Sequence, residues 1–117
     1  MSDEEWTPVS PTPRSGHVAV AVGNYIAVWG GYTRVQPDEV NQFFQNAEKY
    51  IPSNEVCLYD VENKMWSVIV TDGQVPPGIS GASAVAVQHE MYILCGHSMG
   101  GNINTTFSLD LLQRRWT

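Results

Sequence analysis

The sequence is poor in cysteine and in basic residues. Two cysteines in 117 residues are too few for a disulfide framework, and both fall in apolar strand patterns. We therefore expect Cys57 and Cys95 to be buried free thiols in a reducing compartment. Six Lys and Arg against twelve Asp and Glu give a net charge of −6. Because binding to phosphates needs a clustered positive surface, these scattered basic residues argue against nucleic acid as a partner.

Segments for membrane insertion, secretion or nucleotide binding are also missing. No apolar run reaches the ~18 residues of a membrane-spanning helix, and the acidic residues 1–5 lack the basic and apolar regions of a signal peptide. The glycines form neither a G-x-G-x-x-G pattern nor a Gly-Lys-Ser/Thr phosphate loop. We expect a soluble protein of the cytoplasm, the nucleus or both, with no membrane association and no cofactor.

The clearest pattern present is a short apolar strand that runs into two glycines. Residues 25–29 are β-branched and aromatic, and Gly30-Gly31 follows directly. Adjacent residues without Cβ atoms permit positive φ and the close approach of another backbone. Gly23-Asn24 is a strong hairpin signal after the apolar residues 17–22. This segment predicts a buried hairpin that ends in a close backbone contact.

The same pattern occurs twice in the chain. Residues 15–31 align without a gap to residues 80–96, and residues 60–66 align to residues 110–116. Each copy has four expected strands, at 17–22, 25–29, 55–59 and 65–70 in the first and at 82–87, 91–94, 106–109 and from Trp116 in the second. Four short antiparallel strands per unit, separated by glycines and tryptophans, are typical of a β-propeller blade.

The motifs that recur resemble the kelch repeat. They are Arg14-Ser15-Gly16-His17, the Gly30-Gly31 pair, and Tyr59 followed by Trp66. The resemblance implies an all-β fold of two four-stranded antiparallel kelch blades, a partial β-propeller with a truncated second blade. The expected divisions are a flexible tail over 1–13, blade 1 over 14–70, a linker over 71–78 that breaks pairing, and an incomplete blade 2 over 79–117.

Blade 1 contains a long loop over residues 33–54. Long loops without regular structure are often functional, but Phe43 and Phe44 also suit a cap on a nearby core, and both interpretations stay open. Within the loop, Ala47-Glu48-Lys49 is expected to form one helical turn.

Residues 28–32, 50–55 and 75–81 are similar to the first two blades of the kelch domain-containing substrate receptors of cullin–RING ubiquitin ligases. This resemblance implies a protein-interaction module that recognises C-terminal peptide degrons, such as a terminal Gly-Gly. It places four residues on the ligand-binding face: Tyr32, Ser15, Ser80 and His97. The ligase adaptor is implied as a partner only if a longer product exists, because its helical docking segment has no counterpart here. The arginines with which later blades of these receptors bind the terminal carboxylate also have no counterpart in this sequence.

Two alternatives to a ligase receptor remain: a truncated isoform or gene fragment without independent activity, and a generic kelch scaffold. No enzyme is expected. Ser15 and His17 lack a third group to orient the histidine, and Cys95, His97 and His17 are too few converging donors for zinc. The tyrosine and histidine metal ligands of a galactose-oxidase type of propeller are also lacking.

The remaining singled-out residues have structural roles in this interpretation. Trp66 and Trp116 are expected to pack between neighbouring blades, and Asp60 and Asp110 to form Asx-type turns. Two blades leave apolar faces without a neighbour. We therefore expect self-association through open blade faces that carry Val20, Val28, Ile93, Leu94, Trp66 and Trp116.

Overall fold

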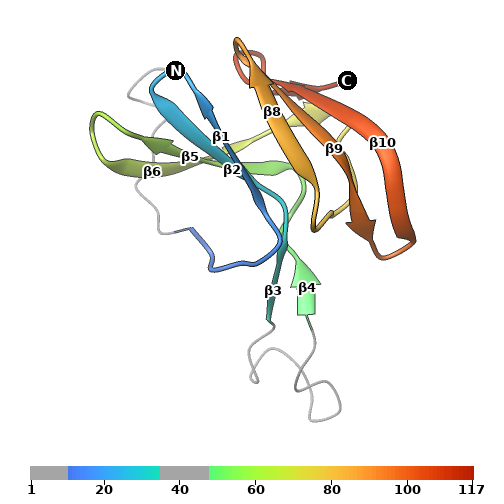
Figure 1. Ribbon diagram of the computed structural model, residues 1–117. Helices are drawn as coiled ribbons and strands as arrows, with labels where there is room; N and C mark the ends of the chain where they lie inside the picture. The colour runs from blue at the N-terminus through green and yellow to red at the C-terminus, as the bar shows by residue number, and fades with distance from the viewer. Residues whose placement is uncertain (1–10, 35–47) are drawn as a thin grey trace.

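The computed structural model describes residues 11–34 and 48–117, and their regular structure consists of β-strands (Figure 1). None of these residues belongs to a helix long and apolar enough to cross a membrane. Most of the predicted tail and the phenylalanine pair of the long loop lie outside the described residues. The two main sheets lie side by side, one for each copy of the repeat (Figure 1).

The first copy forms a four-stranded antiparallel sheet in the order β1-β2-β5-β6. Its strands are β1 (Val18–Val22), β2 (Tyr25–Trp29), β5 (Glu55–Asp60) and β6 (Met65–Val70). The β1–β2 hairpin turns at the predicted glycine, with Val22 opposite Tyr25. Each predicted strand of blade 1 is therefore present, and its four-stranded antiparallel architecture is confirmed.

The second copy forms the same sheet with one additional strand. Its strands are β7 (Asp72–Gly73), β8 (Ser83–Val87), β9 (Glu90–Ser98), β10 (Gly101–Asp110) and β11 (Arg115–Trp116), in the order β7-β11-β10-β9-β8. The extra strand β7 pairs with β11 in parallel. The prediction that 71–78 breaks pairing is thus wrong at Asp72–Gly73, because the end of the second blade returns to pair with the connection between the blades.

The long loop of blade 1 contributes a small ribbon. Strands β3 (Tyr32–Arg34) and β4 (Glu48–Tyr50) form a separate two-stranded antiparallel sheet, with Thr33 opposite Lys49. The predicted helical turn is wrong for Glu48 and Lys49, because one isolated turn has a high nucleation cost and pairing with β3 supplies their backbone hydrogen bonds. The ribbon projects from one end of the blades (Figure 1).

One apolar core joins the two blades. The Trp29 and Trp116 rings, one from each blade, lie 5.5 Å apart between centroids, and both side chains are almost fully buried. Their indole N–H groups donate to the Ser53 carbonyl at 2.8 Å and to the Thr71 hydroxyl at 2.9 Å, so neither polar group is left unpaired. Trp116 therefore packs between blades as expected.

The residues expected on open faces differ in their exposure, and Trp66 is partly exposed. Trp66 packs on Tyr59 of its own sheet, with ring centroids 5.0 Å apart. Ile93 and Trp116 are buried in the shared core. The exposed apolar face instead includes Val85 and Val87, which are 53% and 57% exposed.

Gly31 makes the close backbone contact that the glycine pair predicts. Its N–H donates to the Ile79 carbonyl at 2.8 Å, and its own carbonyl accepts from Ile51 N–H at 2.9 Å. With φ at +85°, a Cβ atom on Gly31 would lie 2.5 Å from the Ser15 carbonyl oxygen and 2.9 Å from the His17 nitrogen. Only glycine fits this position without moving the neighbouring backbone.

Cys95 occupies the position of Gly30 in the second copy and keeps its left-handed conformation, with φ at +62° against +78°. The residue is exposed, whereas Cys57 is buried as expected. The prediction of a buried Cys95 is wrong because the left-handed conformation interrupts the alternation of side chains along the strand. A non-glycine residue held here costs about 1 to 2 kcal/mol.

The aspartates that end β5 and β10 form the predicted Asx turns. Asp60 Oδ1 accepts from the N–H groups of Glu62 and Asn63 at 3.0 and 3.1 Å. Its second oxygen accepts from the Asn63 side-chain amide at 2.8 Å, and this bond is the main reason that the pKa of Asp60 lies below its usual value. Asp110 Oδ1 accepts in the same way from Leu112 and Gln113 N–H.

We expect Gly31→Ala to lower the free energy of unfolding by about 2 to 4 kcal/mol, because it adds an overpacked contact to backbone strain. Gly81→Ala is the matched control. Gly81 also has positive φ, but a Cβ there would meet no atom within 4 Å, so the cost should be about 1 to 2 kcal/mol. Urea unfolding measures both, and equal losses would contradict a steric role for Gly31.

Replacing Cys95 with glycine should raise the free energy of unfolding by roughly 0.5 to 1 kcal/mol, because it removes the left-handed strain but adds freedom to the unfolded chain. Cys95→Ser keeps the strain and should leave stability unchanged. Thermal melting under reducing conditions compares the three proteins. An equal gain for serine would attribute the effect to loss of the thiol.

Candidate functional site

The structure brings the four predicted ligand-binding residues to one end of the two blades. Ser15 and Tyr32 are joined by two backbone hydrogen bonds of 2.9 Å, and Ser80 and His97 by bonds of 2.9 and 2.8 Å. A further bond of 3.0 Å from Gly81 N–H to the Gly16 carbonyl links the two pairs. The repeat thus places equivalent residues of both blades beside each other.

Three of these residues line one cavity of about 330 Å³. Tyr32 comes from blade 1, Ser80 and His97 come from blade 2, and Tyr50 of the β3–β4 ribbon completes the wall. Tyr50 Oη donates to the His97 carbonyl at 3.3 Å. Tyrosine, serine and histidine side chains combine apolar rings with hydrogen-bonding groups, as binding sites for peptides do.

A second cavity of about 740 Å³ lies next to the first and shares Tyr32, Glu48 and Lys49 with it. The predicted residue Ser15 lines this larger cavity, together with Arg14 and Arg34. Three of the six basic residues of an acidic chain therefore gather here, and Glu48 supplies the one carboxylate among the described residues that line the cavity. We refer to these two cavities together as the basic cleft.

The arginines of the basic cleft have different surroundings. Arg14 is partly buried, and its guanidinium donates to the Gly30 carbonyl and the Cys57 sulfur, both at 3.4 Å. Arg34 is exposed and forms no ion pair with any residue in 11–34 or 48–117. Arg34 thus presents an exposed side chain at the wall of the basic cleft, while Arg14 supplies fixed positive charge.

The basic cleft is not evident in the sequence, where the basic residues are scattered. Arg34 and Lys49 are separated by fifteen positions, and only the pairing of β3 with β4 places both on one ribbon. One signal was present: Tyr50 begins one of the segments that resemble the ligase receptors. A planar guanidinium beside a lysine is a suitable arrangement for binding a carboxylate.

His97 lies at the rim of the basic cleft. Its side chain is exposed, and its Nδ1 is 3.2 Å from the Asn102 side-chain oxygen across the β9–β10 hairpin. This contact orients the ring and leaves Nε2 for a ligand. Ser15, Tyr32 and Ser80 likewise remain partly or fully exposed.

Comparison with known proteins agrees with this architecture. The model of the KLHDC2/KLHL20/DRC7 Kelch-repeats domain matches residues 1–117. Kelch domain-containing protein 2 from Homo sapiens is 41% identical over 100 residues, which cover 86% of this chain and 23% of that protein. Kelch domain-containing protein 1 from Homo sapiens is 32% identical over 101 residues, with coverages of 86% and 23%.

A more distant relative is Host cell factor 1 from Homo sapiens, which is 31% identical over 91 residues, or 75% of this chain and 4% of that protein. The chain thus spans about a quarter of the length of the kelch domain-containing proteins that it matches. As a set of kelch repeats it is a protein-interaction module. The chain belongs to the family of the KLHDC2/KLHL20/DRC7 kelch-repeat domains.

Proposed function

We propose that this chain supplies part of a peptide-binding surface in a kelch-type substrate receptor of a cullin–RING ubiquitin ligase. The ligand proposed is the C-terminal end of a protein, such as a terminal Gly-Gly, and the chain acts by binding and not by catalysis. The observation that carries the proposal is the basic cleft, in which an acidic chain gathers half of its basic residues beside the predicted ligand-binding residues.

A free C-terminus offers one carboxylate and a short extended backbone. Arg34 suits the carboxylate, because a guanidinium donates two parallel hydrogen bonds to it. Tyr32 and Tyr50 present ring faces, and Ser80 and His97 present donors and acceptors for the peptide backbone. The size and openness to solvent of the adjoining cavities fit a chain end better than a small apolar ligand.

We propose the ligase adaptor as a partner only of a longer product, one that carries a docking segment. A receptor of this kind would work in the cytoplasm, the nucleus or both. A generic kelch scaffold that binds an acidic protein surface is the competing function, because the basic cleft suits that ligand too. The two functions differ in whether the ligand's terminal carboxylate is required.

Binding of a fluorescein-labelled peptide that ends in a free Gly-Gly tests the proposal by fluorescence polarisation. The same peptide with an amidated C-terminus should bind at least tenfold more weakly, since a charge-assisted hydrogen bond contributes about 1.5 to 3 kcal/mol. Tyr32→Ala and Arg34→Gln should each weaken binding by about 1 to 2 kcal/mol.

Lys64→Gln is the matched control for charge. Lys64 lies in the β5–β6 turn, at the other end of the blade from the basic cleft, so its loss should leave affinity unchanged. Equal affinity for the free and the amidated peptide would favour the generic scaffold. No binding of either peptide, with intact folding of the chain, would count against both functions.

We also propose that this chain associates with itself through the exposed face of β8. Val20 and Val22 of β1 pack against the shared core, whereas the aligned residues Val85 and Val87 are exposed. Light scattering after size exclusion should show masses above 13.0 kDa that rise with concentration. The double variant Val85→Lys/Val87→Lys should abolish the rise of mass with concentration, and the control Val61→Lys should not. A constant monomer mass would contradict the proposal.

A further inference from the structure

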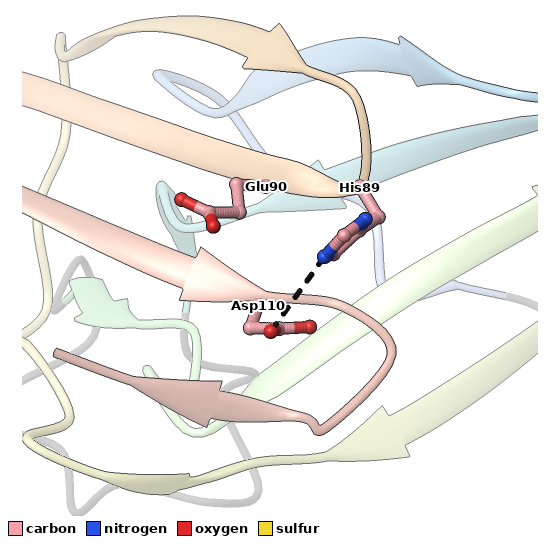
Figure 2. A group of neighbouring side chains, drawn as sticks. All are labelled: His89, Glu90 and Asp110. Atoms are coloured by element: carbon pink, nitrogen blue, oxygen red, sulfur yellow. Dashed lines mark ion pairs between the residues drawn. The ribbon is translucent and has the colours of Figure 1, made fainter.

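His89, Glu90 and Asp110 form a cluster at the end of blade 2 opposite the basic cleft. One donor atom from each residue lies within 4.8 Å of the other two. His89 Nε2 is 3.7 Å from Asp110 Oδ2, and Figure 2 shows the imidazole directed toward that carboxylate, with Glu90 beside them. Among the described residues, this is the one group of three or more such donors, and it contains none of Cys95, His97 and His17.

The backbone holds the three residues in place. Glu90 and Asp110 are direct partners across the β9–β10 pair, so their side chains lie on the same face of the sheet. His89 precedes Glu90 in the β8–β9 turn, and its carbonyl accepts from Leu111 N–H at 3.0 Å. The Asx turn occupies Asp110 Oδ1 and leaves Oδ2 directed toward the histidine.

Blade 1 provides an internal comparison, because it has the same backbone without this donor set. The residues aligned with His89 and Glu90 are Asn24 and Tyr25, and the Asn24 carbonyl accepts the equivalent hydrogen bond from Val61 N–H at 3.0 Å. Asp60 forms the same Asx turn as Asp110, but its second oxygen is taken by the Asn63 amide. A kelch blade therefore does not need the imidazole or the second carboxylate at this turn.

Tyr92 supports the cluster in blade 2. Its hydroxyl donates to Glu90 Oε2 at 2.7 Å, and this bond raises the pKa of Tyr92. Ala27 is the aligned residue in blade 1 and offers no such donor. Tyr92 is a positioning residue, since hydrogen bonds from neighbouring groups orient the ligands of metal sites.

We propose that His89, Glu90 and Asp110 bind a divalent transition-metal ion such as Zn²⁺. One imidazole nitrogen and two carboxylate oxygens suit zinc better than calcium or magnesium, which take oxygen ligands. Zinc bonds of about 2.0 to 2.2 Å place ligand atoms roughly 3.4 Å apart. The three donor atoms lie within 4.8 Å of one another, so rotations of these partly exposed side chains must shorten the longest separation by at most about 1.4 Å. The ion would connect the β8–β9 and β10–β11 turns and keep open coordination positions for water.

Zinc binding can be measured by titration calorimetry on the whole chain with Cys95→Ser, which removes the exposed thiol. One ion should bind per chain. His89→Asn, which installs the residue found in blade 1, and Glu90→Gln should each weaken affinity by at least roughly tenfold, as changes at metal sites do. His97→Asn is the matched control and should bind as before. Calcium in excess should not displace the ion.

Imidazole nitrogen NMR supplies an independent readout, because the chain has three histidines. Addition of zinc should shift the His89 resonances and leave those of His17 and His97 in place. Unchanged affinity in His89→Asn, or equal shifts of all three rings, would overturn the proposal and leave His89 and Asp110 as an ion pair. Thermal melting without zinc verifies that each variant is folded.

Discussion

The close approach of three chain segments at Gly31 is the constraint on which the rest of the structure depends. Strand β2 ends just before Gly31. At the start of blade 1, the Ser15 carbonyl oxygen lies 2.5 Å from where a Cβ atom on Gly31 would be. In the connection to blade 2, the Ile79 carbonyl accepts a hydrogen bond from the Gly31 N–H. Backbone atoms can approach this closely only where no side chain intervenes. This contact sets how blade 2 lies against blade 1, and it places Tyr32 directly beside Ser15.

The two ends of the blades follow from different local chemistry. At the basic cleft, left-handed residues bring backbones together and turn the next side chain outward, so that Tyr32 and His97 occupy equivalent places. At the opposite end, Asx turns close the outer hairpins in both blades. Because these backbone devices recur, the side chains that differ between copies are those free to acquire binding roles, and the His89 cluster is one such difference.

The shared core explains why equivalent strands differ in exposure. Blade 2 covers one face of blade 1, so Val20 and Val22 pack against the core, and no described residue covers the corresponding Val85 and Val87 to the same extent. Trp116 illustrates the same asymmetry, since it is buried against Trp29 while the aligned Trp66 packs within its own sheet. A repeat sequence therefore predicts the blade, but a residue's burial depends on which side has a neighbour.

Local patterns in the sequence were sufficient for the blades themselves. Short apolar runs, the glycine pairs and the aspartates of the Asx turns act over a few positions, and they predicted all four strands of blade 1 and the repeat. The grouping of Tyr32, Ser15, Ser80 and His97 at one end of the blades was implied only by the resemblance to kelch-type receptors, and the strand pairing brings them together. Tertiary structure decided what depends on distant partners. Strand β7 exists because β11 returns to it, Glu48 and Lys49 are extended because β3 pairs with them, and Cys95 is exposed because its position demands a left-handed backbone. The basic cleft and the His89 cluster likewise join residues far apart in sequence, whose proximity comes from strand pairing and no local signal.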